Sequence, residues 1–374
     1  MTLFDENVTV DPAPRSQPSR RVVSGTWALS IALLVLLVIS FLPTAYVIQQ
    51  KGPVYNTLGT AENADGDDVP LISIEGAETY PTGGALDLLT VQVVGNRERT
   101  PSWFELAVAW FDPSRAVIPI DRIFPAGQTT EQRNEESVQL MVDSQTEATA
   151  AALRELDYDV EPHPAVYAVS EGSAAEGVLE AGDVILAVDG EPMTETAEVS
   201  ERIAAGEGEP VELTIERAGE EQTVSVTPRQ TEVDGEQRWL VGVQLMADFD
   251  FPFDVNLQLN NVGGPSAGMM FALGIIDVLT PGELNGAQQV AGTGTIDADG
   301  VVGPIGGIRQ KLYGARDAGA DYFLAPEANC NEVVGHVPDD LRVFSVVDLD
   351  DALDALDAIR TGGDLDALPT CTAP

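Results

Sequence analysis

The stretch G-G-P-S-A-G-M-M-F-A-L-G-I-I-D-V-L, residues 263–279, is the part of the sequence that decides the fold. Gly263 and Gly264 allow a tight loop, Pro265 suits the first turn of a helix, and the following residues are apolar nearly all round. The stretch therefore predicts a buried helix with Ser266 at its N-terminus. Unpaired backbone amides and the positive end of the helix dipole gather there, and both can stabilise an oxyanion. A Gly-Pro-Ser turn also occurs for purely structural reasons, so this stretch alone assigns no chemistry.

The segment V-A-G-T-G-T-I-D-A-D-G-V-V-G-P-I-G-G-I-R-Q-K-L-Y-G-A-R-D-A-G-A, residues 290–320, predicts two strands joined by a D-A-D-G turn and then a helix starting near Gly307. The helical neighbours of Lys311 at three and four residues are Gly307, Ile308, Gly314 and Ala315. None of them can pair with an ammonium group. Lys311 is therefore expected on a small, apolar side of the helix, where desolvation lowers its pKa and makes it usable as a base.

Charge composition supports this interpretation of the lysine. The 374 residues include 61 acidic and 19 basic residues, a formal net charge of −42, and the only lysines are Lys51 and Lys311. Arginine stays protonated in proteins, whereas a buried lysine can lose its proton. Apart from Lys51, every other basic residue is an arginine, and a lysine kept at position 311 in such a chain favours a role that needs a neutral amine.

These motifs resemble the proteolytic domain of the Lon family, whose catalytic pair is a serine in G-P-S-A-G and a lysine on a later helix. The resemblance covers residues 250–360, including Thr293-Gly294, the G-x-V-x-P-I-G-G pattern over 300–307, and A-D-Y-F-L-A-P-E-A-N over 320–329. It implies an α/β proteolytic domain over 240–362, followed by a tail over 363–374. The site residues that it implies are Ser266 as nucleophile, Lys311 as general base, and Thr293, Gly264, Pro265 and Ala267 as supporting residues.

The sequence departs from the Lon pattern at two points. Many Lon-type sites carry an acidic residue two places before the proline, where this chain has Gly263. A P-loop needs a lysine in G-x-x-x-x-G-K-[ST], and neither lysine of this chain stands in that pattern. The chain resembles the bacterial membrane-anchored Lon-like proteases that carry a PDZ domain. The resemblance implies ATP-independent proteolysis without a cofactor.

A second domain is expected over residues 157–232. The segment A-G-D-V-I-L-A-V-D-G, residues 181–190, with flanking strands and a helix over Thr196–Ala205, resembles a PDZ domain of bacterial envelope proteases. Such domains bind an extended peptide as an added strand. The expected peptide-binding residues are Val166, Tyr167, Ala168 and Val169. A plain β-domain spacer is the alternative.

The N-terminal part predicts a membrane anchor. Residues 25–48 form a mainly apolar run of over twenty residues without a charge, preceded by arginines. This pattern favours a transmembrane helix with a cytoplasmic tail over 1–24. A cleaved signal peptide is the rival, but the apolar run is long and no A-x-A site follows. The remaining domains would then lie at the outer face of the cytoplasmic membrane. Residues 49–156 are expected to be an extracytoplasmic α/β region of unknown role, with a helix over 131–156.

Other chemistries find little support in the sequence. His163 and His336 stand beside prolines in turns and have no metal-ligand or triad spacing, so no metal is expected. The strong negative charge argues against nucleic acid as a partner and is most simply a solvated surface, although it could also recruit a basic protein. Cys330 and Cys371 could form a disulfide or remain free thiols.

The expected fold class is thus α+β multidomain: one N-terminal transmembrane helix, a PDZ-like β-domain and a C-terminal Lon-type α/β proteolytic domain. The expected function is a serine endopeptidase acting on protein or peptide substrates, with the PDZ domain recruiting or gating them. A homo-oligomer is expected, with a hexameric ring as the form common among Lon-type domains. The alternative is a catalytically inactive PDZ-containing membrane scaffold or receptor.

Overall fold

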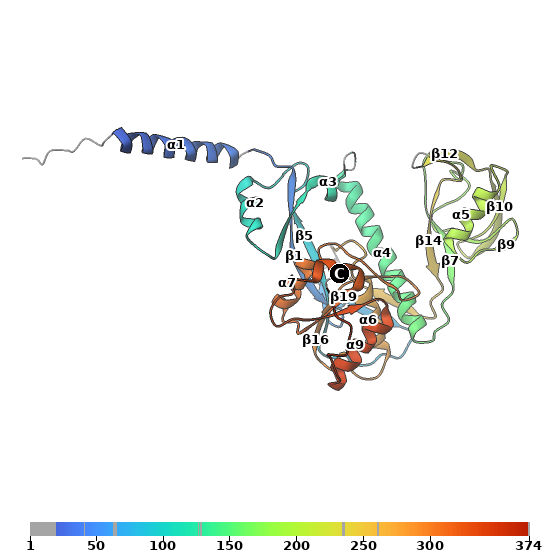
Figure 1. Cartoon of the computed structure of the whole chain (residues 1–374). Helices are drawn as coiled ribbons and strands as arrows, with labels where there is room; N and C mark the ends of the chain where they lie inside the picture. Colours follow the sequence, from blue (N-terminus) through green and yellow to red (C-terminus); the bar gives the residue numbers. More distant parts are fainter. Residues whose placement is uncertain are drawn as a thin grey trace, which may run out of the picture.

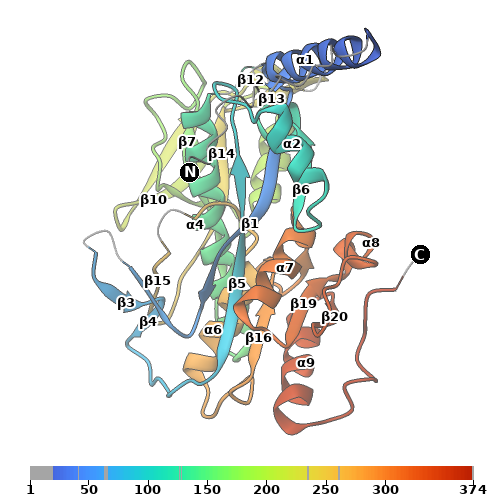
Figure 2. The same cartoon turned by 90° about the vertical axis from the view of Figure 1, so that its left-hand side faces the viewer.

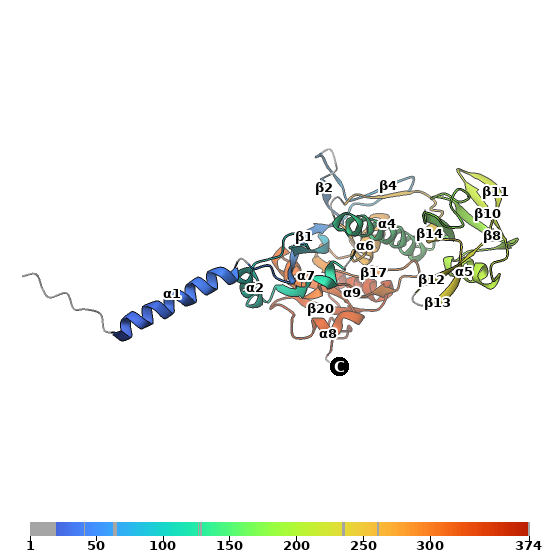
Figure 3. The ribbon, with the colours of Figure 1, turned by 90° about the horizontal axis from the view of Figure 1, so that it is seen from above.

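The computed structural model describes residues 20–40, 42–62, 66–125, 127, 129–233, 236–259 and 262–372. Helix α1 (Arg20–Ser40) extends away from the body of the protein (Figures 1 and 3). Most of the tail expected over residues 1–24 lies outside the described residues, as do the last two residues of the tail expected at the C-terminus.

The prediction of a transmembrane helix over residues 25–48 is wrong. Within the described ranges, no helix combines the length and the apolar character needed to cross a membrane. Beyond Ser40 the chain forms strand β1 (Tyr46–Asn56), so that Val47 and Ile48 are buried in a sheet instead of continuing a helix. The expected single-pass location, with the other domains at the outer face of the cytoplasmic membrane, rested on that helix and is overturned with it.

A mixed six-stranded sheet forms the centre of the protein (Figures 1 and 2). Its strands, in spatial order, are β20 (Arg342–Val346), β19 (Tyr322–Pro326), β16 (Gln289–Gly292), β5 (Ala85–Val94), β1 (Tyr46–Asn56) and β6 (Arg115–Pro119). Strands β5, β16, β19 and β20 are parallel, whereas β1 is antiparallel to both β5 and β6. Half of this sheet comes from the segment 49–156, to which the sequence assigned no role, and half from the segment expected to be proteolytic. The two segments therefore share one core.

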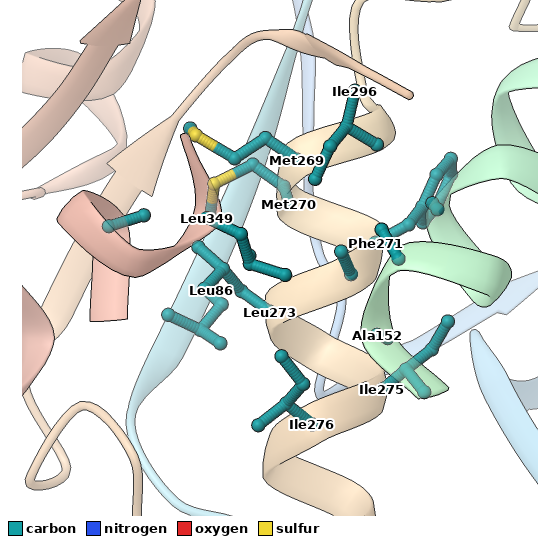
Figure 4. Close-up of a cluster of buried hydrophobic side chains, with 14 of the residues drawn as sticks. Leu86, Ala152, Met269, Met270, Phe271, Leu273, Ile275, Ile276, Ile296 and Leu349 are labelled. Carbon is teal, nitrogen blue, oxygen red and sulfur yellow. The ribbon is translucent and has the colours of Figure 1, made fainter. Parts of the chain in front are cut away.

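Helices cover both faces of the sheet. The helices on one face are α4 (Thr130–Glu155), α6 (Gly268–Leu279) and α9 (Leu349–Thr361), and those on the other are α7 (Ile308–Ala318) and α8 (Cys330–Val333). Successive strand residues alternate between the two cores, as with Val290 beneath α6 and Ala291 beneath α7. Helix α6 is buried on nearly every side because it lies between α4 and the sheet, and Figure 4 shows Leu273 of α6 close to Leu86 of β5. The apolar composition of residues 268–279 is explained by this position.

Shorter elements flank this body. They are the strand pairs β2 (Thr60–Glu62) with β3 (Asp68–Pro70), β4 (Ile72–Glu75) with β15 (Asp254–Leu257), and β17 (Thr295–Ile296) with β18 (Val302–Gly303), the helices α2 (Trp103–Trp110) and α3 (Ile120–Ile123), and the 3₁₀ turn η1 (Glu327–Asn329). The predicted helix over 131–156 is confirmed as α4, which begins with a capping box between Thr129 and Gln132.

A second sheet is inserted between α4 and β15, at the right of Figure 1. Its strands, in spatial order, are β11 (Glu220–Val226), β10 (Val211–Arg217), β8 (Val184–Val188), β7 (Pro162–Val169) and β14 (Val243–Phe249), with β9 (Glu191–Pro192) beside β8. Helix α5 (Thr196–Ala205) packs its buried residues Val199 and Ile203 into the same core, and the hairpin β12 (Arg229–Val233)–β13 (Glu236–Leu240) lies against α5. Strand β14 completes this sheet from beyond residue 232, where the sequence predicted the end of the domain.

The C-terminal segment is tied back to the body. After α9 the chain passes along β20, where the Ser345 amide donates a hydrogen bond to the Pro369 carbonyl over 2.9 Å. Cys330 and Cys371 form a disulfide with a Cα–Cα distance of 4.9 Å, which resolves the two alternatives that the sequence left open. The tail therefore covers the edge of β20 and is covalently fixed to α8.

Candidate active site

Ser266 lies in the turn that precedes α6, close to the position that the sequence predicts. Gly264 has a φ of +87°, a conformation that favours glycine, and it reverses the chain so that residues 265–267 lead into the helix at Gly268. Ser266 is half-buried, whereas the neighbouring Ala267 is buried. The hydroxyl group thus stands at the edge of the core and remains accessible to a ligand.

Lys311 reaches the Ser266 hydroxyl from the other face of the sheet. Its Nζ lies 2.8 Å from Ser266 Oγ and 2.8 Å from Thr293 Oγ1. Its side chain is only 1% exposed, and no ion pair with a carboxylate is found for it among the described residues. Burial without a counter-charge lowers the pKa of Lys311 to about 7, because the low-dielectric surroundings disfavour the ammonium form. A large fraction of the amine is therefore neutral near neutral pH.

Glycines allow the helix of Lys311 to approach the sheet closely. Gly307 has a φ of +72°, and a side-chain carbon there would come within 2.8 Å of Gln49 and Val91. A side-chain carbon at Gly314 would be 3.3 Å from Leu89. The small residues that the sequence places beside Lys311 therefore bring α7 against β1 and β5, and this contact buries the amine.

Thr293 follows strand β16 and connects the two other residues. Its hydroxyl accepts a hydrogen bond from Lys311 and lies 2.9 Å from the Ser266 carbonyl oxygen, to which it donates. The Gly294 amide donates to the same carbonyl over 3.1 Å. Ser266, Thr293 and Lys311, from three separate segments, thus meet as one hydrogen-bonded group.

The backbone amides around Ser266 differ in what they can bind. The Gly264 amide is already used, since it donates to the Ser137 carbonyl of α4 over 2.8 Å, and Pro265 has no N–H. The amides of Gly268 and Met269 donate to protein carbonyls as well. By contrast, the backbone amides of Ser266 and Ala267 have no hydrogen-bond acceptor within the described part of the chain. These two amides are the candidates for an oxyanion hole.

A cavity of about 350 Å³ opens beside Ser266. Its wall includes the side chains of Tyr55, Leu88, Met141 and Val262. Ser266 and Ala267 also line the cavity, so a ligand side chain held there would lie next to Ser266. A mostly apolar wall favours apolar side chains.

The prediction that residues 166–169 border a peptide groove needs correction. These residues lie in β7, an interior strand whose backbone pairs with β14 along its length and also contacts β8. An added peptide strand needs an unpaired edge. In the described residues β14 pairs with no strand other than β7, and α5 lies near it, so β14 supplies the open edge on this side of the sheet.

Neither histidine forms a described contact with Ser266, Thr293 or Lys311. His163 lies in β7 beside Asp250, and His336 lies in a turn after α8. No cluster of residues suited to bind a metal occurs in the described ranges. The acidic stretch after residue 347 forms helix α9, whose buried side includes Leu349 and Leu356.

Sequence reasoning missed two residues that hold the site together. Ser144 of α4 is buried and donates from Oγ to the Pro265 carbonyl over 2.9 Å. Asn329 forms two hydrogen bonds with the backbone of Ile305, just before α7. A signal for Ser144 was present, since it lies at helical spacing from Met141 and Ala148 in an otherwise apolar stripe.

Comparison with known protein families identifies two kinds of domain in the chain. Residues 261–358 match the Lon protease (S16) C-terminal proteolytic domain, and residues 165–217 match a PDZ domain. The chain therefore carries a Lon-type proteolytic domain together with a PDZ domain.

Similar curated proteins include the Lon protease of Campylobacter concisus, 35% identical over 94 residues (24% of this chain and 11% of that protein), and Lon protease 2 of Herpetosiphon aurantiacus, 40% identical over 93 residues (24% and 11%). The zinc metalloprotease RasP of Geobacillus kaustophilus is 42% identical over 73 residues (20% and 17%). The chain thus spans less than a fifth of the length of these relatives. Among solved structures, the PDZ domain of an SdrC-like protein from Listeria monocytogenes is 22% identical, covering 22% of this chain and 85% of that one, with a TM-score of 0.20.

Proposed function

We propose that this protein is a serine endopeptidase that cleaves protein or peptide substrates with a Ser266–Lys311 dyad. The observation that carries the proposal is the 2.8 Å contact between Lys311 Nζ and Ser266 Oγ, with the lysine buried and in no ion pair with any of the described carboxylates. A serine is a weak nucleophile until a base removes its proton, and a lysine is a base only when it is neutral. The short contact supports proton transfer from the serine to the lysine, and the burial supports a neutral lysine.

Catalysis begins when neutral Lys311 takes the proton of Ser266 and the serine oxygen attacks the scissile carbonyl carbon. A neutral amine has two N–H bonds and one lone pair. Donation of one N–H to Thr293 Oγ1 leaves the lone pair free to face Ser266 Oγ. The negative charge that develops on the substrate oxygen is stabilised by the amides of Ser266 and Ala267.

The second half of the reaction returns the site to its starting state. The Lys311 ammonium group gives its proton to the leaving amine as the carbon–nitrogen bond breaks, which leaves an ester on Ser266. Water then loses a proton to neutral Lys311 and attacks the ester, so that the acid product leaves and the serine regains its proton. The apolar cavity beside Ser266 is proposed to hold the substrate side chain that precedes the cleaved bond.

Proteolysis is proposed to be independent of ATP, because the chain has no lysine in a P-loop pattern. The PDZ domain is proposed to recruit or gate substrates by pairing an extended segment with the β14 edge. Assembly as a homo-oligomer, with a hexameric ring as its form, is supported only by the resemblance to Lon-type domains.

The experiment is a cleavage assay with an unfolded protein such as casein, in the absence of ATP. Wild-type protein is compared with Ser266→Ala and Lys311→Met, and we expect both variants to lose at least about 10³-fold in kcat/KM. The control is Lys51→Arg, because Lys51 is the only other lysine and pairs with Asp317 on the surface. Equal cleavage by wild type and Ser266→Ala would refute the proposal. Tight peptide binding without any cleavage would instead favour a PDZ scaffold.

A further inference from the structure

Helix α4 contacts the turn that holds Ser266, residues 263–267, through a hydrogen bond that the proposed mechanism does not use. Ser144 is 4% exposed, and its Oγ donates to the Pro265 carbonyl oxygen over 2.9 Å. α4 belongs to the segment 49–156 and lies outside the part of the chain that matches the Lon proteolytic domain. A residue far from Ser266 in the sequence therefore touches the peptide group that immediately precedes it.

The geometry of the peptide group gives this contact a consequence. In a planar trans peptide the C=O and the following N–H point in opposite directions, and the described chain contains no cis peptide bond. The Pro265 carbonyl accepts the short bond from Ser144 and a longer one, over 3.4 Å, from the Gly268 amide. The Ser144 bond therefore helps to fix the direction of the Ser266 N–H. In the same way, Thr293 and Gly294 bind the Ser266 carbonyl and fix the direction of the Ala267 N–H.

We propose that Ser144 is a positioning residue for the oxyanion hole, which it serves by orienting the Ser266 amide through the Pro265–Ser266 peptide plane. The inference rests on the proposed peptidase function and assigns α4 a part in it. Ser144 and Thr293 act on consecutive peptide planes, so that the two candidate amides are each held from the carbonyl side. Ser144 touches neither substrate nor the reacting atoms.

The Ser144 hydroxyl is closely packed in apolar surroundings, where the Pro265 carbonyl is its hydrogen-bond acceptor. A side-chain carbon at Gly268 would come within 2.9 Å of Ser144 Oγ, so the last glycine of G-P-S-A-G provides the space for the hydroxyl. Met141 and Ala148, on the same side of α4, are both buried in the apolar core. A hydroxyl in such a place is unfavourable unless it is hydrogen-bonded, and its partner here is the Pro265 carbonyl.

The test uses Ser144→Ala and Ser144→Cys, because cysteine nearly keeps the volume of serine but is a weak hydrogen-bond donor. Removal of one oxyanion donor typically lowers kcat by about 10²- to 10³-fold, and misdirecting a donor that remains present should cost about 10- to 100-fold. We expect both variants to show this loss in kcat with little change in KM. The matched control is Thr149→Ala, which removes another buried hydroxyl of α4 whose bond stays within the helix, at the Gln145 carbonyl.

A second readout separates orientation of the amide from general damage. A peptide boronic acid that reacts with Ser266 places an oxygen of its tetrahedral, negatively charged boron in the oxyanion hole. We expect both Ser144 variants to bind the boronate more weakly by a factor similar to the loss in kcat, and to keep the pH midpoint of kcat/KM, because Lys311 is unaffected.

The outcomes distinguish this inference from the function on which it rests. If Ser144→Cys behaves like wild type while Ser144→Ala does not, the role of Ser144 is packing and the inference is overturned. It is overturned as well if both variants keep kcat and boronate affinity within about threefold of wild type. Wild-type protein that neither cleaves peptides nor binds the boronate would refute the peptidase function, and the inference with it.

Discussion

Replacement of Lys311 by methionine should make the protein more stable at neutral pH while abolishing its activity. The pKa of Lys311 falls from an ordinary value of 10.5 to about 7 in the folded protein. At 1.36 kcal/mol for each tenfold change in the proton equilibrium, burial of this lysine destabilises the fold at pH 7 by about 4 kcal/mol. Methionine has a similar length and no charge, so the variant is free of this penalty.

The variant also loses favourable contacts. The two hydrogen bonds from Nζ to Ser266 and Thr293 disappear, at a cost of about 1–3 kcal/mol together. We therefore expect Lys311→Met to raise the free energy of unfolding at pH 7 by about 1–3 kcal/mol.

The pH dependence of this gain is the decisive feature. Between pH 7 and pH 10.5 the unfolded chain binds a proton at Lys311 that the folded protein does not, so the stability of the wild type rises with pH in this window. The advantage of Lys311→Met should therefore shrink by about 1.4 kcal/mol per pH unit above pH 7.

The assay is guanidinium unfolding of wild type and Lys311→Met at several pH values from 6 to about 10. Lys51→Met serves as the control, because an exposed ion pair such as Lys51–Asp317 is worth about 1 kcal/mol or less. A difference between wild type and Lys311→Met that stays constant over this range would refute the reasoning, since Lys311 would then carry its proton in the folded state as in the unfolded one.

Three further predictions concern the same site and the C-terminal tail. The kcat/KM for peptide cleavage should rise with pH through a midpoint near 7, because only the neutral form of Lys311 is active. A pH–rate profile checks this, and a flat profile from about pH 5 to 9 would contradict it. Thr293→Val should lower kcat by about 10- to 100-fold, whereas Thr293→Ser should keep most of it, because the hydroxyl orients both Lys311 and the Ser266 carbonyl; steady-state kinetics of the two variants compare them directly. Cys371→Ser should lower the free energy of unfolding by about 4 kcal/mol, because the disulfide joins residues 41 positions apart. Urea unfolding measures this change. An unchanged urea midpoint would mean that the disulfide contributes nothing to stability.

The sequence was most informative where short-range spacing controls the geometry. The small residues three and four positions from Lys311 predicted an uncharged, buried environment, and α7 does bury the amine against the sheet. G-P-S-A-G likewise predicted a turn into a core helix. In both cases the physical cause acts within one or two helical turns, so it can be recognised in the local sequence.

Long-range pairing could not be recognised in this way. Nothing in the residues of β5 specifies that it lies beside β16, about two hundred positions later, so the sequence left the role of the segment 49–156 unknown. The groove prediction failed for the same reason, because β14, which covers β7, lies beyond the predicted end of the PDZ domain. The transmembrane prediction counted apolar residues across Ser40 and did not register that Val47 and Ile48 belong to a buried strand.

The central claim is that Ser266 forms a covalent bond with the substrate and that Lys311 activates it. Its most direct test is intact-protein mass spectrometry of samples quenched in acid during cleavage of a peptide substrate, followed by mapping of the modified site. The account predicts an acyl adduct on the fragment that contains Ser266, absent from Ser266→Ala and strongly reduced in Lys311→Met. Continued cleavage by Ser266→Ala, or an adduct on any other residue, would contradict it.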